Sequence, residues 1–524
     1  MPHTVEIDIT PEQYSDPRSV LAAVARKARL STEQIARLQP LRRSLDARRG
    51  VMYHLTVDVY LKGEPYSEPD YRSEYCDCHN APPLVIIGAG PAGLFAALRA
   101  LEAGLRPIIL EQGKPVETRK ADIAAAARLG IVNPASNWCF GEGGAGTYSD
   151  GKLYTRATKR GDVGYVLRKL VEHGADPDIL VDTHAHIGTD RLGGIIKNIR
   201  QTVLDHGGEY HFGTRVTNFV VSDSQPTTVL GAKDSDGNVY EGVGVVLATG
   251  HSSRDIYELF ALRGWLLEAK PFAIGVRVEH SQQLIDEIQY HLRGAQGERL
   301  RKLLPPASYA LKAQVDGHGV FSFCMCPGGV IVPAATADRQ QVVNGMSDSH
   351  RSSAFANSGI AVTVSAEDVP EYASHGPLAL LRFQQEVERS TFEAAGCRIN
   401  APSQRLADFC ASRPSSSLNK SNYLGSCVSV PVHELLPPFV VKCLQQGFRL
   451  FDRKMHGFLT SEASILAVES RTSSPVRIPR DASLQHPQLR NLYPCGEGAG
   501  YAGGIVSSAI DGVNAVEAIY SSKL

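Results

Sequence analysis

The stretch that decides the fold is LVIIGAGPAGLFAALRALEAGLRPIILEQG, residues 84–113. A short apolar strand leads through a glycine-rich turn into an alanine-rich helix and then a second apolar strand. Gly88, Gly90 and Gly93 form the pattern G-x-G-x-x-G directly after the first strand. The first glycine allows a tight turn, the second lets the backbone approach a pyrophosphate, and the third lets the helix pack closely on the strand. Because the helix start also offers free N–H groups to phosphate, the pattern predicts a dinucleotide site.

An acidic residue stands where such a site needs one. Glu111 ends the second strand, 23 residues after Gly88. Its carboxylate can accept hydrogen bonds from both hydroxyls of a ribose. This favours an unphosphorylated adenosine ribose and disfavours NADP.

A second glycine-rich segment decides which dinucleotide is expected. NLYPCGEGAGYAGGIVSSAIDGVNAVEAI, residues 491–519, runs from a short strand through a glycine turn into a helix. A dehydrogenase that binds only NAD does not need this segment, whereas a flavin does. The N1–C2=O edge of the isoalloxazine gains negative charge on reduction, and a helix N-terminus aimed at it stabilises that charge. The two ends of the chain together predict FAD.

The expected fold is α/β: a discontinuous Rossmann-like FAD-binding domain with an inserted α+β substrate domain and a small N-terminal β-α-β domain. The predicted boundaries are 1–80, 81–264, 265–470 and 471–524. In the first unit, helical stretches are expected around 17–47 between two alternating strands, and Ser31 with Gln34 predicts a capping box for the second helix. No chemistry is assigned to this unit.

Composition excludes several functions. The chain has 524 residues, with 54 Lys+Arg against 55 Asp+Glu, so no basic field favours nucleic acid or an anionic membrane. No apolar run approaches the roughly 20 residues of a membrane helix, and the start has no secretory pattern. The ten cysteines are scattered, which indicates free thiols in a reducing compartment. The cytoplasm is the expected location, and no metal is expected.

The motifs resemble those of the bacterial FAD-dependent dehydrogenase family, NAD(FAD)-utilising dehydrogenase-like proteins that are distantly related to flavoproteins with a glutathione-reductase type of FAD domain. The resemblance covers nearly the whole chain. Its motifs are GAGPAGLFAA (88–97), FGEGGAGTYSDGKLYTR (140–156), HIGTDRL (186–192), LATGHSSRD (247–255), KPFAIGVRVEH (270–280), SFCMCPGG (322–329), VNGMS (343–347), SRTSSPVRIPR (470–480) and CGEGAGYAGGI (495–505).

This resemblance implies a set of cofactor contacts. It places the ADP half at Gly88, Gly90, Pro91, Ala92, Gly93 and Glu111, with adenine against the backbone of Val216. It places a second loop along the flavin, with Gly143, Gly144, Gly146, Ser149 and Lys152, the last a partner for the pyrophosphate or N5. It has Thr249 and Gly250 line the cofactor where the chain leaves the FAD domain, and it places the ribityl and flavin end at Gly496, Glu497, Gly503, Gly504 and Ile505.

Three residues outside the glycine motifs are candidates for catalysis or substrate binding. An arginine within an apolar strand, such as Arg277, is costly to bury unless it meets an anion, either a substrate carboxylate or an internal partner such as Glu279 or Glu469. Arg471 lies in a polar turn rich in donors and is a second candidate substrate contact. His251 follows the ATG strand and is the leading general acid/base candidate, with helix capping as the alternative.

Cys324 and Cys326 are the most unusual pair. Alternate residues of a strand point to the same face, so the two thiols are expected to be neighbours. They are either redox partners of the flavin or small apolar core residues. A zinc site with Cys76 and Cys78 is disfavoured because C-x-C pairs are poor chelates.

The predicted function is FAD-dependent oxidoreduction of the dehydrogenase or oxidase type, with hydride transfer between a small organic substrate and flavin N5. No second G-x-G-x-x-G occurs in a β-α-β context, so reoxidation is expected by oxygen, by an electron carrier, or by NAD(P)H that enters transiently. A flavin-dependent monooxygenase is one alternative. A non-catalytic FAD-binding protein that recruits a partner through its N-terminal domain is the other.

Overall fold

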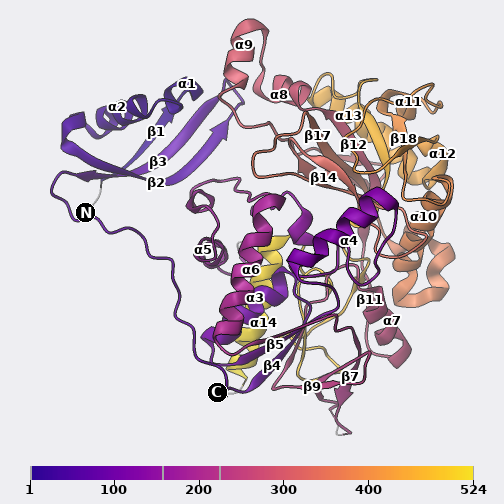
Figure 1. The fold of residues 1–524 in the computed structure, drawn as a ribbon. Helices are drawn as coiled ribbons and strands as arrows, with labels where there is room; N and C mark the ends of the chain where they lie inside the picture. The colour runs from indigo at the N-terminus through magenta and orange to yellow at the C-terminus, as the bar shows by residue number, and fades with distance from the viewer. Residues whose placement is uncertain (1–2, 156–158, 224–225, 523–524) are drawn as a thin grey trace.

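The computed structural model describes residues 3–155, 159–223 and 226–522. Its N-terminal unit is a three-stranded antiparallel sheet in the order β1-β3-β2, which projects to one side in Figure 1 and contacts the rest of the chain through Arg43, paired with Asp178 and Asp182. Helix α2 packs against it, and Val24, Leu55 and Val57 belong to its core. The elements are β1 (His3–Ile9), α1 (Pro11–Tyr14), α2 (Pro17–Ala28), β2 (Ile35–Asp46) and β3 (Met52–Leu61).

The prediction of a second helix in this unit is wrong. The Ser31–Gln34 capping box forms, but it caps a single 3-10 turn, and the chain then continues as strand β2. Pro40 is the physical reason, because proline inside a helix removes a hydrogen bond and clashes with the preceding turn. In β2 it is tolerated at an irregularity of an edge strand, where the register shifts between Pro40 and Arg42.

The centre of the molecule is a five-stranded, all-parallel sheet in the order β22-β10-β4-β5-β6. Successive residues of β4 point to opposite faces: Leu84 and Ile86 pack under helices, whereas Val85 and Ile87 pack on a second small sheet. The strands are β4 (Pro83–Ile87), β5 (Arg106–Glu111), β6 (Glu209–Phe212), β10 (Val245–Leu247) and β22 (Leu492–Pro494).

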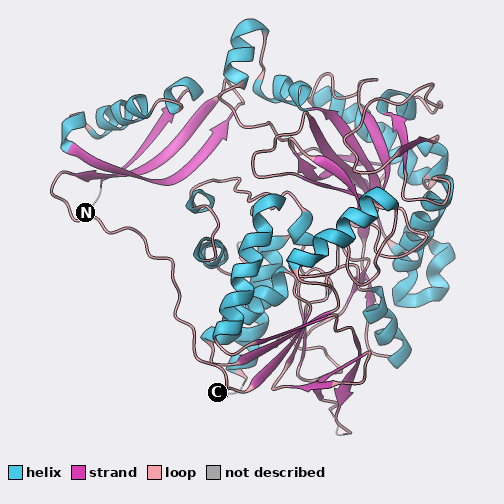
Figure 2. Ribbon diagram, viewed as in Figure 1, coloured by secondary structure: helices cyan, strands magenta, loops and turns pink. Residues whose placement is uncertain are grey.

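Helices cover one face of this sheet, and the antiparallel sheet β7-β8-β9 and a helix cover the other (Figures 1 and 2). The first helix after the glycine turn, α3, lies beside the last helix of the chain, α14. The elements are α3 (Pro91–Glu102), α4 (Val116–Leu129), α5 (Val163–Glu172), α6 (Thr189–Asp205), α14 (Ile505–Ser521), β7 (Val216–Val221), β8 (Val229–Asp234), β9 (Val239–Glu241) and α7 (Arg254–Arg263).

The chain between these two ends builds a seven-stranded mixed sheet in the order β13-β14-β17-β12-β20-β18-β19. Alternate residues of β12, among them Val276 and Val278, face a core that includes α13. The intervening Arg277 and Glu279 therefore point to the opposite face. The strands are β12 (Phe272–Ser281), β13 (Lys312–Val315), β14 (His318–Cys326), β17 (Phe355–Val364), β18 (Ala401–Arg405), β19 (Cys427–Ser429) and β20 (Ser464–Glu469).

Smaller elements surround this sheet. The hairpin β15-β16 and the two-stranded sheet β11-β21 are separate from it. The elements are β11 (Glu268–Ala269), α8 (Gln282–Tyr290), α9 (Gly294–Arg301), β15 (Val330–Pro333), β16 (Val343–Met346), α10 (Ala379–Ala394), α11 (Leu406–Cys410), α12 (Val432–Leu435), α13 (Pro438–Lys454) and β21 (Val476–Arg477).

The predicted fold class is confirmed: an α/β protein whose Rossmann-like sheet is completed by the C-terminal strand β22. The division at residues 81, 265 and 471 stays a prediction. Within the described ranges, no helix is both long enough and apolar enough to cross a membrane.

Candidate functional site

The site is a cavity of about 350 Å³ at the carboxyl ends of the parallel strands. This size is usual for a ligand or cofactor site. Its wall combines the turn after β4, the loop 139–154, the segment after β10, strand β14 and the start of α14. Most of the predicted cofactor residues line it: Gly88, Gly90, Pro91, Ala92, Glu111, Gly144, Gly146, Ser149, Lys152, Val216, Thr249, Gly250, Gly496, Glu497, Gly503, Gly504 and Ile505.

The first glycine turn is shaped by close backbone contacts. Gly88 has φ of +105°, and a Cβ there would lie 2.5 Å from the carbonyl oxygen of Ala248. Gly93 does not line the cavity; a Cβ on it would overlap the carbonyl oxygen of Gly88. Within the described residues no side chain caps the start of α3, where Pro91 is the first helical residue. The first N–H groups of this helix therefore remain for a phosphate.

Glu111 organises this end of the cavity. One carboxylate oxygen accepts from the N–H of Ala89 at 2.9 Å, and the other accepts from Gly113 at 2.8 Å and Gly141 at 3.0 Å. The carboxylate thus ties the first glycine turn to the second glycine-rich loop. A carboxylate has about four acceptor positions, so capacity remains for a ribose hydroxyl.

Arg119 is a buried residue behind the site that sequence reasoning missed. Its side chain is completely buried under the second glycine-rich loop and donates to the carbonyl oxygens of Asn137 (2.8 Å), Glu142 (2.8 Å) and Gly144 (2.9 Å). It forms no ion pair with any described residue, and its Nη2 has no hydrogen-bond partner among them. A buried cation without a carboxylate holds the loop that faces the expected pyrophosphate. Nothing in the surrounding helical sequence VETRKAD signals this role.

The predicted Gly143 also lies outside the cavity wall. Its N–H donates to the carbonyl oxygen of Ala89 at 2.8 Å, and a Cβ on it would overlap the side chains of Thr147 and Ile196. Gly143 therefore packs the second loop against the first turn. Arg156, the last residue of the predicted motif 140–156, lies outside the described residues.

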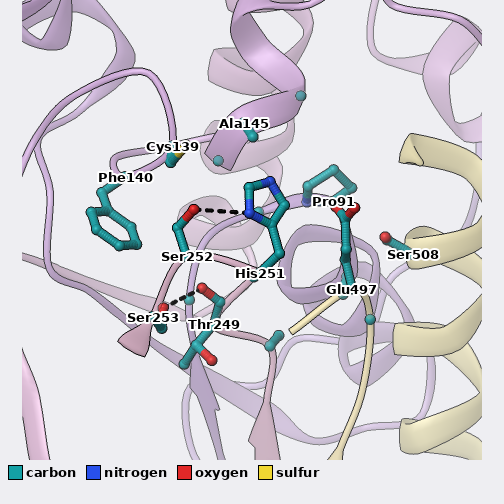
Figure 3. A pocket seen from close by; sticks show the side chains of 18 of the residues that line it. Pro91, Cys139, Phe140, Ala145, Thr249, His251, Ser252, Ser253, Glu497 and Ser508 are labelled. Atoms are coloured by element: carbon teal, nitrogen blue, oxygen red, sulfur yellow. Dashed lines mark hydrogen bonds between the residues drawn. The ribbon is translucent and has the colours of Figure 1, made fainter. Parts of the chain in front are cut away.

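The C-terminal segment supplies the opposite wall. The N–H of Gly496 donates to Asp511 at 2.7 Å, and Arg480 pairs with the same carboxylate at 2.7 Å. Glu497 points toward the cavity beside α14 (Figure 3). Burial raises the pKa of Glu497 to about 8, against the opposing charge of Lys270. The carboxyl group is therefore protonated at neutral pH and able to donate a hydrogen bond.

His251 lies on the cavity wall with Ser252 (Figure 3). Ser252 Oγ is 2.8 Å from Nδ1 of His251 and accepts from Arg471 Nη1 at 3.1 Å. The serine hydroxyl can donate to Nδ1, and in that tautomer the imidazole hydrogen lies on Nε2. Burial, followed by the charges of Arg471 and Arg254, lowers the pKa of His251 to about 4. At neutral pH this arrangement makes His251 a hydrogen-bond donor, and its predicted acid/base role stays a prediction.

Arg471 lines the cavity, but its donors are directed into the protein. Nε and Nη2 donate to the two oxygens of Glu388 at 3.1 Å each, Nη1 donates to Ser252 and Thr336, and Nη2 also donates to Gln340. These bonds use all five N–H groups of a guanidinium. Arg471 thus holds Ser252 in place, and its expected contact with substrate stays a prediction.

For Arg277 the structure shows one of the two expected partners. It lies outside the cavity wall, fully buried, with Nη1 2.5 Å from Glu469 on the neighbouring strand β20. Of the two expected partners of Arg277, a substrate anion or an internal carboxylate, the structure shows the internal carboxylate of Glu469. Its other N–H groups donate to Asn357, Asn344, the Cys324 carbonyl oxygen and Cys326 Sγ.

The two cysteines differ in position. Cys324 lines the cavity, whereas Cys326 lies fully buried behind it. Cys76 and Cys78 lie elsewhere, against the carbonyl oxygens of Glu102 and Leu101. The described residues contain no group of three or more His, Cys, Asp or Glu side chains suited to a metal ion.

Several further cavity residues escaped the sequence analysis: Cys139, Phe140, Asp150, Tyr154, Thr214, Phe323 and Ser508. Most stand inside or beside the motifs quoted above, so proximity to a motif was the available signal. Figure 3 shows Cys139 and Phe140 across the cavity from Glu497 and Ser508.

The cavity residues fit FAD. No neighbouring atom lies within 4 Å of where a Cβ would be at Gly250, Gly503 or Gly504, so the backbone is open to a ligand at these points. An acidic residue and an uncapped helix start stand at one end, and a second uncapped helix, α14, begins at the cavity wall. These are the features that a dinucleotide with a flavin requires.

Comparisons with known proteins agree with this fit. A model described as "FAD binding domain" matches residues 84–137, one described as "FAD-dependent protein, C-terminal domain-like" matches 271–472, and a domain of unknown function matches 1–60. An uncharacterised protein of Clostridium beijerinckii is 38% identical over 95% of this chain and 94% of its own length. A digeranylgeranylglycerophospholipid reductase of Methanothrix thermoacetophila is 36% identical over 22% of this chain and 34% of its own length.

The solved structures that resemble this chain do so only loosely. CtdE in complex with FAD has a TM-score of 0.33 at 12% identity, and covers 84% of each chain. A geranylgeranyl bacteriochlorophyll reductase-like protein of Thermoplasma acidophilum has a TM-score of 0.32 at 12% identity, covering 84% of this chain and 78% of the other. Both scores are low and carry no information about the reaction of this chain.

The cofactor prediction is confirmed, and the protein binds FAD. With similarity to the clostridial protein over 95% of its length, one match to an FAD-binding domain and one to the C-terminal domain of FAD-dependent proteins, the chain belongs to a family of FAD-dependent flavoproteins.

Proposed function

We propose that the protein is an oxidoreductase that transfers hydride between a small organic substrate and N5 of its flavin. One observation supports this most strongly. A single cavity joins the glycine turn of the FAD motif to residues of the inserted sheet, among them Phe323, Cys324 and Asn344. The inserted segment thus closes the cavity opposite the nucleotide end, where a substrate would have to bind.

The chain supplies positioning and charge stabilisation to this reaction. Bound FAD supplies the hydride acceptor and donor. The uncapped start of α14 offers N–H groups to developing negative charge. His251 offers its Nε2 hydrogen, and Glu497 offers a protonated carboxyl group. Arg471 keeps Ser252 and His251 in place through Glu388.

Lys152 belongs to the substrate end in this proposal. Its Nζ donates to the carbonyl oxygen of Met325, on the same strand as Cys324, and it lies 4.0 Å from Asp150. Of its two predicted roles, this position supports a contact near N5 over one at the pyrophosphate. A partly exposed ammonium there would also attract an anionic substrate.

The sheets of the described residues bear on which molecule reoxidises the reduced flavin. It has one all-parallel sheet, and that sheet carries the FAD turn. Oxygen, an electron carrier or a transiently bound NAD(P)H is therefore proposed as the acceptor, in keeping with the dehydrogenase-like grouping. The ten free cysteines support a reducing compartment, and we place the protein in the cytoplasm.

Anaerobic reduction of the flavin tests the function. The holoprotein is mixed with a panel of alcohols, amines, hydroxy acids and reduced nicotinamides, and the visible absorbance of oxidised flavin is followed. Bleaching by a member of the panel, at a rate that saturates with its concentration, is the expected result. A flavin that dithionite reduces but that no member of the panel reduces would contradict the proposal.

A further inference from the structure

Cys324 and Cys326 form a pair at the edge of the cavity. The register of β14 against β17 shifts between Phe323 and Cys326, and Cys324 has φ of +44°. This bulge turns Cys324 into the cavity wall while Cys326 stays buried, and Cys326 Sγ lies 3.2 Å from the carbonyl oxygen of Cys324. The Cys326 side chain thus lies against the backbone of Cys324, and the two thiols shift each other's pKa.

Two cations face this pair. Arg277 Nη2 is 2.6 Å from the carbonyl oxygen of Cys324 and 3.6 Å from Cys326 Sγ. Lys152 approaches from the cavity side, through the carbonyl oxygen of the intervening Met325. Two acidic groups are near as well, Glu469 beside Arg277 and Asp150 near Lys152, and each is paired with a cation.

This environment separates the two thiols chemically. A hydrogen bond from Cys326, followed by the charges of Lys152 and Arg277, lowers the pKa of Cys324 to about 5 against the effect of burial. The same hydrogen bond, together with burial, raises the pKa of Cys326. A thiolate that faces a ligand cavity, beside a buried neutral thiol, is the arrangement that thiol–disulfide chemistry uses.

A second C-x-C pair in the same chain shows that spacing alone does not create this environment. Cys76 is exposed, and Cys78 is buried against the carbonyl oxygen of Leu101. Burial raises the pKa of Cys78 to about 11, and neither residue lines the cavity. The pair Cys76–Cys78 is therefore an internal control.

We propose that Cys324 and Cys326 are a redox-active pair that exchanges two electrons with the flavin. When the pair is oxidised, the Cys326 S–H bond is lost, one Sγ–Sγ bond forms with the Cys324 thiolate, and two electrons and one proton leave the sulfur atoms. The oxidised flavin accepts both electrons and the proton at N5. In the reverse direction the reduced flavin reduces the disulfide. This inference rests on the proposed function in one respect, that flavin N5 is the redox centre of this cavity.

The test uses light to reduce the flavin, so no organic substrate is needed. The holoprotein is oxidised with diamide and desalted, and it is then illuminated with EDTA in the absence of oxygen, so that electrons enter through the flavin. Samples taken before and after illumination are unfolded in guanidinium chloride that contains N-ethylmaleimide, so that the buried Cys326 also reacts, and the labelled cysteines are identified by peptide mass. The experiment is done in the Cys76→Ser/Cys78→Ser variant, so that the other C-x-C pair does not contribute labelled cysteines.

After diamide, residues 324 and 326 should be joined and unlabelled; after illumination, both should label. FAD-free protein treated in the same way should keep the disulfide, because its electrons have no entry point. Cys326→Ser, a change outside the cavity wall, should retain FAD and leave Cys324 labelled at every stage.

Two results would overturn the proposal. One is labelling of both residues after diamide, which means that no disulfide forms. The other is a disulfide that persists while the flavin is fully bleached. Neither result requires a variant that could fail to fold. Neither result bears on the hydride-transfer proposal, which is tested separately by the substrate panel.

Discussion

Arg471 and Glu388 meet face to face in the interior, with Nε and Nη2 of the guanidinium each 3.1 Å from a different carboxylate oxygen. Arg254 adds a third bond of 2.7 Å to the same carboxylate. Burial alone would raise the pKa of Glu388, but the two arginines hold it at about 2. One anion thus balances two buried cations behind His251, on the cavity wall.

Replacing Glu388 by Gln should therefore destabilise the protein strongly. Two arginines would lose their shared anion, and breaking a buried pair by removing one partner costs about 3–5 kcal/mol. The free energy of unfolding in urea measures this. Glu386→Gln on the same helix is the control, because Glu386 pairs with Arg389 near the surface, and its unfolding should match the wild type. Equal effects of the two substitutions would contradict the network.

Gly93→Ala tests the first glycine turn. The new methyl group would overlap the carbonyl oxygen of Gly88, and overpacking of this kind costs about 1–3 kcal/mol. FAD affinity should fall with it, because the turn that meets the pyrophosphate is displaced. Gly194→Ala in α6 is the control: it has open space and ordinary helical backbone, and it should gain up to about 1 kcal/mol. Isothermal titration with FAD, together with urea unfolding, checks both variants.

Arg119→Met tests the buried cation under the second loop. Three carbonyl oxygens would lose a charged donor, and a hydrogen bond to a charged group is worth about 1.5–3 kcal/mol. We expect FAD affinity to fall by about tenfold or more, with Lys restoring part of it. Arg128→Met, at the exposed end of the same helix, should bind FAD as the wild type does. Unchanged affinity in Arg119→Met would show that the loop holds its shape without the cation.

The reactivity of Cys324 should depend on pH in an unusual way. Because the hydrogen bond from Cys326 and the charges of Lys152 and Arg277 lower the pKa of Cys324 from 9.0, its rate of reaction with iodoacetamide should stay high at neutral pH and fall only on acidification well below pH 9. Cys326→Ala removes the hydrogen bond and should move the midpoint to higher pH. Cys78, with its pKa raised to about 11, should react only at alkaline pH. A midpoint for Cys324 near 9 would contradict the environment described here.

The sequence predicts the FAD half of the site well because its signals are local. Each glycine motif carries the strand, turn and helix start that shape the turn, so Gly88 and Gly504 can be placed without knowledge of the rest. The helix predicted where strand β2 lies was wrong for a local reason too, because Pro40 disfavours a helix despite the capping box before it.

The pairings that the sequence did not predict join distant parts of the fold. Arg277 is unusual in its strand, but its partner Glu469 comes from β20, 192 residues later, and only the sheet register brings them together. Arg471 lies in a turn that is rich in hydrogen-bond donors. Its partners Glu388 and Ser252 come from distant segments, so the sequence did not predict them. Arg119 acts on backbone carbonyl groups, which leave no mark in sequence.

A crystal structure of the protein with bound FAD tests the central claim most directly. The account predicts the ADP half against the turn at Gly88 and the carboxylate of Glu111, and the isoalloxazine between the start of α14 and Cys324. A flavin bound in the reverse orientation, or seated away from both glycine-rich segments, would contradict it.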